Sequence, residues 1–326
     1  MIFPQKLQKG DEVRIIAPAM SYKIIGEDVR LLAKERLEKM GLKVSFGKNI
    51  ELIDGFVSSP VSARIEDLHD AYRDTNVKAI FTVIGGWNSN ELLDYIDYEL
   101  IRNNPKMLIG YSDITALQNA ILAKTGIVSY SGPHYSTLGM KYGADYTLVN
   151  LEKILFDGDE INYIPSNEWS DDPEWFIDQE KRTFKKNDGV FVVNAGSARG
   201  TLLGGEMTTL QLLFGTPYMP EAKDTILALE ITEISANSSK YIFERMLQSI
   251  IQQIWFKNVK GIIIGRMQDE MNLSVVDIKT ITDLHPELKN MPILANIDFG
   301  HTYPMATLPI GGEIEIKDNS ISIMKH

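Results

Sequence analysis

A serine lies where an apolar segment gives way to a helical pattern, a position that can hold a nucleophile. The segment KMLIG (106–110) has strand character, and Ser112 separates it from the helical pattern DITALQNAILAKTG. The free N–H groups of a first helical turn can stabilise an oxyanion beside such a serine. Serine is equally a common helix N-cap, so the position alone leaves both interpretations open. Ile114 replaces the last glycine of the motif G-x-S-x-G, which disfavours an ordinary α/β-hydrolase.

A nucleophilic serine needs a general base, and histidine is the usual one near neutral pH. His301 has the best local context, because it follows an apolar segment and a glycine in ANIDFGHTYPMATLPIG. His134, in SGPHYS, follows another strand-like segment and is a second candidate for a cleft position. The remaining histidines are expected at the surface or at the chain end: His69, His285 and His326.

A carboxylate should orient the histidine and stabilise its charged form. Glu230 ends the strand-like segment TILALE, where it would face a cleft, and Glu233 is the competing residue three positions later. The sequence has no H-E-x-x-H motif and no clustered histidines, so neither a metal ion nor another cofactor is expected. The segment IIAPAMSY also lacks the G-x-G-x-x-G motif of a dinucleotide-binding site.

The composition restricts the partners and the compartment. The chain has 326 residues, a net charge of −11 and no cysteine. This charge disfavours nucleic acid and anionic membranes as partners. The absence of cysteine excludes thiol catalysis, disulfides and cysteine-bound metals. No apolar segment is long enough for a signal peptide or a membrane span, so we expect a cytoplasmic protein.

The elements that must position these side chains fall into two halves. Strand-like segments such as EVRIIAPA and VKAIFTVIGG alternate with helical patterns over residues 1–164, which predicts parallel βαβ units with helices on both faces. Residues 165–189 are charged, contain Trp169 and Trp175, and lack a period, so they are interpreted as a linker or substrate loop. Residues 190–326 predict a smaller, mixed α/β domain.

Five blocks, in this order, resemble the LD-carboxypeptidase family of serine peptidases, which includes the microcin-immunity (MccF-like) peptidases. They lie roughly between residues 80 and 312 and read GGWNSNELL, IGYSDITAL, GTLLGGEMTTLQLLFGTPYMP, ILALEITE and DFGHTYPMATLPIG. The resemblance implies a catalytic triad of Ser112 as nucleophile, Glu230 as acid and His301 as base. Ile231 replaces the second acid of the family's LED motif, but Glu230 itself is retained.

The resemblance also carries expectations about the oxyanion hole, the fold and the assembly. It implies an oxyanion hole made of the backbone N–H groups of Gly86 and Asp113. It further implies an N-terminal Rossmann-like domain, a smaller C-terminal domain that supplies the acid and the base, and an active site in the interdomain cleft. Members of this family are expected to be homodimers.

Two substrate classes are compatible with such a triad, because both reactions are acyl transfers. An MccF-like enzyme would hydrolyse aminoacyl-nucleotide (microcin-type) conjugates and give resistance to them. A murein LD-carboxypeptidase would remove the terminal D-alanine from tetrapeptides in peptidoglycan recycling. A non-catalytic protein that binds aminoacyl nucleotides is a further alternative.

The segment at 165–189 and the stretch YSGPHYSTLGMKYG look more like MccF-like members, so we favour the first class. Trp169 and Trp175 are candidates for stacking on a nucleobase, with anchoring of the loop as the alternative, and His134 is a further candidate substrate contact. A terminal carboxylate would instead need a cation, and the candidates are Arg182, Arg199 and Lys240.

Overall fold

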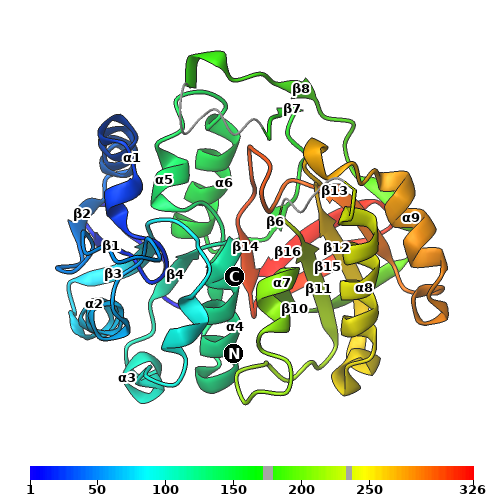
Figure 1. Cartoon of the computed structure of the whole chain (residues 1–326), viewed down its shortest axis with the longest axis horizontal. Coiled ribbons are helices and arrows are strands. Elements are labelled where there is room, and N and C mark those ends of the chain that lie inside the picture. The colour runs from blue at the N-terminus through cyan, green and yellow to red at the C-terminus, as the bar shows by residue number, and fades with distance from the viewer. Residues whose placement is uncertain (172–178, 233–236) are drawn as a thin grey trace.

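The computed structural model describes residues 1–171, 179–232 and 237–326, which form two α/β halves lying side by side (Figure 1). The N-terminal half holds a mainly parallel sheet and the C-terminal half a mixed sheet. The expected two-domain α/β architecture is thus confirmed. No helix in the described part of the chain has both the length and the apolar character needed to cross a membrane.

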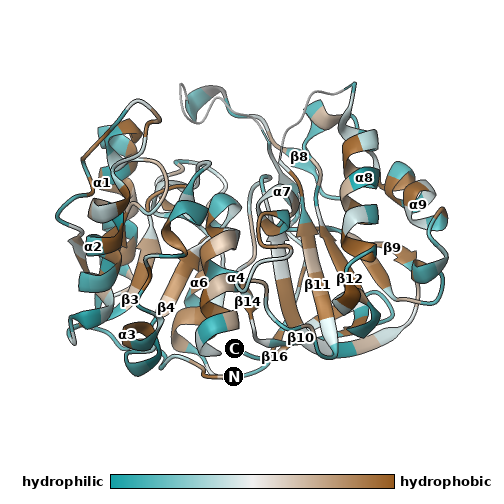
Figure 2. Ribbon diagram, turned by 60° about the horizontal axis from the view of Figure 1, so that its bottom comes forward, coloured by the Kyte–Doolittle hydropathy of each residue, from teal (hydrophilic) through white to brown (hydrophobic). Residues whose placement is uncertain are grey.

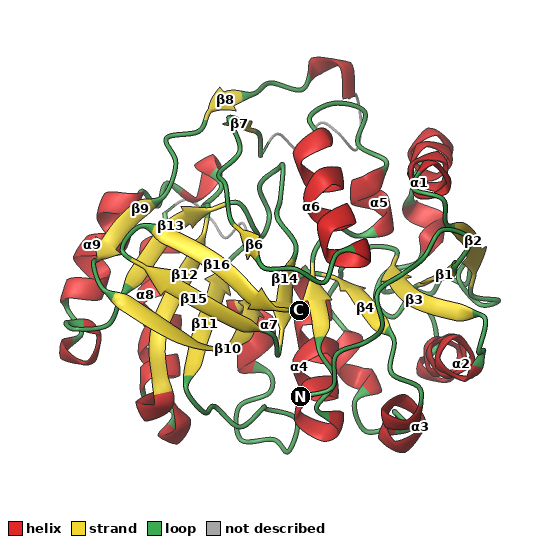
Figure 3. Ribbon diagram, turned by 180° about the vertical axis from the view of Figure 1, so that it is seen from behind, coloured by secondary structure: helices red, strands yellow, loops and turns green. Residues whose placement is uncertain are grey.

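The first sheet has the strand order β14-β5-β4-β3-β1-β2. Its strands are β1 (Glu12–Ile16), β2 (Lys43–Phe46), β3 (Val77–Thr82), β4 (Met107–Gly110), β5 (Ser129–Ser131) and β14 (Leu308–Ile310). Its helices are α1 (Glu27–Lys39), α2 (Val61–Arg73), α3 (Tyr98–Asn103), α4 (Thr115–Thr125), α5 (Tyr135–Leu138) and α6 (Asp145–Phe156). Helices α1, α5 and α6 cover one face of this sheet, and α2, α3 and α4 cover the other (Figures 1 and 3). This is the layered arrangement that alternating strands and helices predict.

The second sheet has the strand order β6-β16-β15-β10-β11-β12-β13-β9. Its strands are β6 (Ile161–Asn162), β9 (Phe191–Asn194), β10 (Ser197–Glu206), β11 (Thr225–Glu230), β12 (Val259–Gly265), β13 (Ile293–Ile297), β15 (Glu313–Lys317) and β16 (Ser320–Lys325). Its helices are α7 (Met207–Gln211), α8 (Ser239–Ile251) and α9 (Val275–Asp283). The strands β10 to β13 are parallel, so their carboxyl ends meet at one edge of the sheet.

Shorter elements lie between the main strands and helices. A two-stranded ribbon pairs β7 (Glu168–Trp169) with β8 (Lys185–Lys186). The 3-10 turns are η1 (Tyr22–Ile24), η2 (Ser89–Leu92), η3 (Ser112–Ile114), η5 (Gln179–Lys181), η6 (Ile254–Asn258), η7 (Asp269–Met271) and η8 (Pro286–Leu288).

The chain crosses between the two sheets more than once. The strand β14 follows His301 in the sequence but pairs antiparallel with β5 of the first sheet. Conversely, β6 lies before residue 165 but pairs with β16 of the second sheet. The domain limits at 1–164, 165–189 and 190–326 stay predictions. Each sheet contains one strand that lies on the other side of these limits in the sequence, β14 in the first sheet and β6 in the second.

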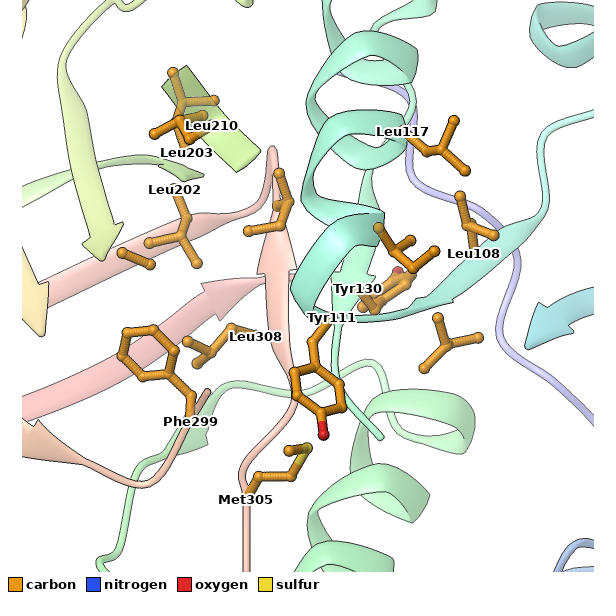
Figure 4. Close-up of a cluster of buried hydrophobic side chains, with 14 of the residues drawn as sticks. Leu108, Tyr111, Leu117, Tyr130, Leu202, Leu203, Leu210, Phe299, Met305 and Leu308 are labelled. Atoms are coloured by element: carbon orange, nitrogen blue, oxygen red, sulfur yellow. The ribbon is translucent and has the colours of Figure 1, made fainter. Parts of the chain in front are cut away.

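Helix α4 lies between the two sheets and joins their cores. It is buried on nearly all sides, as expected of a helix without a polar face. Side chains from the second half, Leu202, Leu203 and Leu210, lie on one side of it (Figure 4). Leu108 and Tyr130 lie on the other side, toward which Leu117 of α4 itself points. Asn119 of α4 donates a 2.9 Å hydrogen bond to the carbonyl oxygen of Gly204 on β10. Apolar residues concentrate on the strands of both sheets (Figure 2), so this helix sits in a continuous core.

Candidate active site

The turn after β4 holds Ser112 in a backbone conformation that non-glycine residues rarely adopt. Its φ angle is +60°, in the left-handed region, and η3 and α4 follow directly. A strained residue of this kind persists only where its surroundings hold it, and such residues gather at functional sites. The N-cap residues of η3 and α4 are Tyr111 and Ile114, and Ser112 is instead the first residue of η3. The interpretation of Ser112 as a helix cap is therefore wrong.

Three side chains from distant parts of the chain form one line of hydrogen bonds. Nε2 of His301 lies 3.0 Å from Oγ of Ser112, and Nδ1 of His301 lies 2.9 Å from Oε2 of Glu230. With its proton on Nδ1 donated to Glu230, the imidazole presents the Nε2 lone pair to the serine hydroxyl. This arrangement allows His301 to take the proton of Ser112 when the oxygen attacks a carbonyl group.

Two glycines make the space for Glu230, the last residue of β11. A Cβ atom on Gly265 would lie 2.9 Å from Cβ of Glu230, and one on Gly300 would lie 2.8 Å from Oε2 of Glu230. Gly300 also has a φ angle of +94°, which favours glycine. The side chain of Glu230 is 4% exposed and that of His301 is 17% exposed. The carboxylate of this pair is thus more shielded from solvent than the imidazole.

The charges around His301 favour its protonated form. Burial alone would lower the pKa of His301, but the charge and hydrogen bond of Glu230, together with the charge of Glu206, raise this pKa above its usual value. The base therefore binds a proton more tightly than a free imidazole does. A base with a pKa near the operating pH is well suited to proton transfer.

The glycine turn after β3 lies directly against the serine. A Cβ atom on Gly85 would lie 2.9 Å from Oγ of Ser112 and 3.5 Å from the backbone nitrogen of Asp113, and one on Gly86 would lie 2.8 Å from Cγ of Met20. Only glycines allow the backbone to pass so closely. The backbone of Gly85 and the backbone nitrogen of Asp113 thus lie close together beside Ser112. The oxyanion hole that the family resemblance implies, made by the N–H groups of Gly86 and Asp113, stays a prediction.

The side chain of Asp113 has a role that the sequence did not reveal. Its Oδ2 accepts hydrogen bonds from the backbone N–H groups of Ser89, at 2.8 Å, and Asn88, at 3.1 Å. Oγ of Ser89 donates in turn to the carbonyl oxygen of Asp113 at 2.7 Å. Burial raises the pKa of the Asp113 carboxyl, and these hydrogen bonds oppose that rise. The contacts fix the segment after Gly86 relative to the serine turn.

His134 lies behind the hydrogen-bonded line and not in it. It is 1% exposed, its Nδ1 lies 2.7 Å from Oγ1 of Thr82, and its ring packs 4.4 Å from that of Tyr111. Tyr111 in turn meets the ring of His301 edge-on at 5.2 Å. Burial lowers the pKa of His134 to about 3, so it is neutral. This buried position does not favour the predicted substrate contact, which stays a prediction.

Two predicted residues, Trp175 and Glu233, lie outside the described residues. Trp169 lies on β7, and its ring is 5.2 Å from Nζ of Lys185 and 5.1 Å from Cζ of Arg266. These contacts favour the alternative that Trp169 anchors the loop.

The other histidines take no part in the hydrogen-bonded line. His285, expected at the surface, is buried with 5% exposure. His69 accepts a hydrogen bond from the backbone N–H of Asp97 at 2.9 Å. His326 is also buried, at 6% exposure, beside Lys6.

The loop that carries His301 is fastened to the 165–189 segment through a buried carboxylate that the sequence did not mark either. Asp298 accepts hydrogen bonds from Oη of Tyr163 at 2.7 Å and from the backbone N–H and Oγ of Ser166 at 2.7 and 2.9 Å. Asn187 donates to it at 3.3 Å, and Arg266 forms a buried ion pair with it at 2.5 Å. Ser166 near the start of the segment and Asn187 near its end thus both bind Asp298, three residues before His301.

The three cations proposed for a terminal carboxylate lie in different settings. Arg199 pairs with Glu313 at 2.5 Å and Lys240 pairs with Asp277 at 2.7 Å, both at the surface. Arg182 is 9% exposed and lies 5.3 Å from the ring of Tyr303, two residues beyond His301. Of the three, Arg182 is the one placed near the hydrogen-bonded line.

Comparisons with known proteins identify the family. The model of the LD-carboxypeptidase N-terminal domain matches residues 13–132, and that of the LD-carboxypeptidase C-terminal domain matches residues 199–316. The chain belongs to the LD-carboxypeptidase family. This chain is 47% identical to the "Putative carboxypeptidase YocD" of Bacillus subtilis. The match covers 97% of this chain and 96% of YocD. The resemblance stated from the sequence is thereby confirmed.

Other relatives of this LD-carboxypeptidase family member differ in the substrates that their names give. The MccF-like protein from Bacillus anthracis is 49% identical, with a TM-score of 0.98 and full coverage of both chains. The Microcin C7 self-immunity protein MccF of Escherichia coli is 29% identical over 97% of this chain and 94% of MccF. The structure of MccF with aspartyl sulfamoyl adenosine has a TM-score of 0.88 at 27% identity, and the match covers 100% of this chain and 99% of the MccF chain. A "Probable murein peptide carboxypeptidase" of Bacillus subtilis is also 29% identical, and the match covers 95% of this chain and 90% of that protein.

Proposed function

We propose that this protein is a serine hydrolase that cleaves an amide-type bond through an acyl-enzyme, with Ser112, His301 and Glu230 as its catalytic triad. The observation that carries the proposal is the continuous hydrogen-bonded line from Ser112 Oγ through His301 to Glu230. The left-handed backbone at Ser112 and the adjacent glycine turn support it, because they expose the hydroxyl beside backbone donors.

The reaction would proceed in two acyl transfers. Oγ of Ser112 attacks the carbonyl carbon while Nε2 of His301 takes the hydroxyl proton, and the N–H groups of Gly86 and Asp113 stabilise the resulting oxyanion. His301 then gives the proton to the leaving nitrogen, the C–N bond breaks, and the acyl group stays on Ser112. A water molecule attacks the ester while His301 takes its proton, and His301 then gives this proton to Oγ of Ser112 as the C–O bond breaks and the acid leaves.

For the substrate, we propose aminoacyl-nucleotide conjugates of the microcin type, so that the enzyme gives resistance to them. Support comes from the 49% identity to the MccF-like protein and from the structure of MccF with aspartyl sulfamoyl adenosine. In such a substrate the aminoacyl group would bind Ser112 and the nucleoside part would leave with the nitrogen. The stacking role predicted for Trp175 belongs to this proposal. Trp169 contributes less to it, because Lys185 and Arg266 already lie against its ring.

Removal of D-alanine from murein tetrapeptides is the second candidate. It is favoured by the relative named as a murein peptide carboxypeptidase, which is as similar in sequence as MccF is. The buried Arg182 near Tyr303 supports it chemically, because a terminal carboxylate needs a cation or a set of N–H donors. The homodimer and the cytoplasmic location expected from the sequence stay predictions.

The test offers the purified protein an aminoacyl-sulfamoyl adenosine and a murein tetrapeptide, with products identified by mass spectrometry. We expect hydrolysis of the first, and a loss of about 10⁴-fold or more in Ser112→Ala. Ser62→Ala, an exposed serine on α2, is the matched control and should keep full activity.

Hydrolysis of the tetrapeptide alone would select the second candidate. Turnover that survives in Ser112→Ala would overturn the triad. Tight binding of the nucleotide analogue without any turnover would instead indicate the non-catalytic binding protein.

A further inference from the structure

A second buried carboxylate lies beside the acid of the proposed triad. Glu206 is the last residue of β10, is 2% exposed, and is paired in register with Glu230 on the parallel strand β11. Side chains of residues paired in register point to the same face of a sheet, and neighbouring strands lie about 4.8 Å apart. Two carboxylates thus emerge next to each other, which is unfavourable unless each has its own partners.

Each carboxylate of this pair does have its own partners. Glu230 faces His301, whereas Glu206 accepts hydrogen bonds from the backbone N–H groups of Thr208, at 3.1 Å, and Thr209, at 2.8 Å. Oγ1 of Thr208 donates a third hydrogen bond to Glu206 at 2.5 Å. Donors of this kind stabilise the ionised form of a buried carboxyl. These three hydrogen bonds hold the Glu206 carboxylate in place at the end of β10.

The backbone of Glu206 touches the element that carries the nucleophile. Its N–H donates a 3.0 Å hydrogen bond to Oγ1 of Thr115, the first residue of α4 and three residues after Ser112. The strand is packed tightly there, since a Cβ atom on Gly205 would lie 2.4 Å from the same Oγ1. Glu206 thus lies where the serine turn of one half meets the acid-bearing strand of the other.

Among the described residues, the groups facing His301 come from several elements, and two of them are charged. They are Tyr111 after β4, His134 before α5, Glu206 on β10, Glu230 on β11, and Tyr303 on the loop of His301 itself. Burial keeps both tyrosines and His134 neutral, since it raises the pKa of each phenol and lowers that of the imidazole. The charge acting on His301 from this set comes from the two glutamates.

We propose that Glu206 is a positioning residue of this site, whose fixed negative charge joins that of Glu230 in stabilising the imidazolium form of His301 while its backbone holds β10 against the serine-bearing turn. The inference rests on the proposed function, in which His301 gains a proton at each attack. Glu230 accepts the hydrogen bond from Nδ1–H of His301, and Glu206 stabilises the developing positive charge through space.

The test removes the charge and keeps the shape, with Glu206→Gln. Loss of a negative charge lowers the pKa of His301, so the acid limb of the kcat/KM profile should move to lower pH by about 0.5–1 unit. The weaker base should also reduce the plateau by roughly tenfold. Titration of the His301 ring by NMR should show the same downward shift without any substrate. Glu206→Asp keeps the charge, so its acid limb and its His301 titration should lie close to the wild-type values.

Thr208→Val is the matched control, because it removes one hydrogen bond to Glu206 and leaves the charge in place. Its acid limb and its ring titration should stay at the wild-type values. An unchanged His301 titration in Glu206→Gln, or an equal shift in Thr208→Val, would overturn the inference. Failure of the proposed function would show separately, as turnover that persists in Ser112→Ala, and the NMR titration would still test Glu206.

Discussion

The change Gly300→Ala tests whether the position of Glu230 controls activity. The new methyl carbon would lie 2.8 Å from Oε2 of Glu230, whereas ordinary contacts begin at 3.4 Å, so the carboxylate must move by the difference of 0.6 Å. That movement disturbs the 2.9 Å hydrogen bond to Nδ1 of His301. A misplacement approaching 1 Å in a catalytic group costs on the order of 10²-fold. We therefore expect kcat/KM to fall between about 10- and 100-fold.

The same change also strains the backbone, and that effect has its own control. Gly300 has a φ angle of +94°, and Gly10 has one of +95°, with no atom within 4 Å of the place that a Cβ atom would take there. Alanine in this region costs roughly 1–2 kcal/mol. A chain of 326 residues has an unfolding entropy of about 0.7 kcal/mol/K, so each variant should lose about 1.5–3 °C in melting temperature. Gly10→Ala should show that loss with unchanged kcat/KM.

The assay is kcat/KM on the aminoacyl-sulfamoyl substrate, measured beside thermal unfolding for both variants. Equal activity in Gly300→Ala and Gly10→Ala would refute the reasoning, because backbone strain alone would then account for the effect of Gly300→Ala. A lower activity in Gly300→Ala at an equal loss of stability would support the contact with Glu230 as the cause.

Three further outcomes are expected. The neutral, active form of His301 is lost as pH falls through its raised pKa, so the acid limb of kcat/KM should lie above the usual value for histidine; a limb well below about pH 6 would contradict the charge argument. Asp298→Ala leaves Arg266 buried and without the partner of its 2.5 Å ion pair, and urea unfolding should show a loss of about 3–5 kcal/mol; a loss under about 1 kcal/mol would show that the network matters little. Gly85→Ala places a methyl carbon 2.9 Å from Oγ of Ser112. We expect kcat/KM to fall at least about tenfold while the melting temperature stays near normal, and wild-type kinetics in this variant would refute the expectation.

The positions of the proposed catalytic residues can be predicted from the sequence because they lie at the ends of strands. Ser112 and Glu230 each close an apolar segment, and His301 follows one together with a glycine. In a parallel sheet the carboxyl ends of strands meet at one edge, so such residues are brought toward a common cleft. The family resemblance then connected the three residues and their order.

Other features depended on contacts between residues far apart in the chain. Ser112 and His301 are separated by 189 positions, and no local pattern sets the 3.0 Å between them. The burial of His285 and the hydrogen bonds that converge on Asp298 arise in the same way, from packing against segments that the sequence does not mark. A helical or strand period reports only which face of an element is apolar.

The sequence by itself therefore determined the two-domain α/β class, the candidate triad residues and the glycine turn, because strand ends, helix starts and glycines are local signals. Only the tertiary structure decided that β14 and β6 join the sheets of the opposite halves, and that Glu206 stands beside Glu230. Pairing of strands is set by long-range packing and register, and a one-residue slip would point Glu206 to the other face. The role of Ser112 is ambiguous by sequence, and its left-handed backbone and contact with His301 support the proposal that it is the nucleophile.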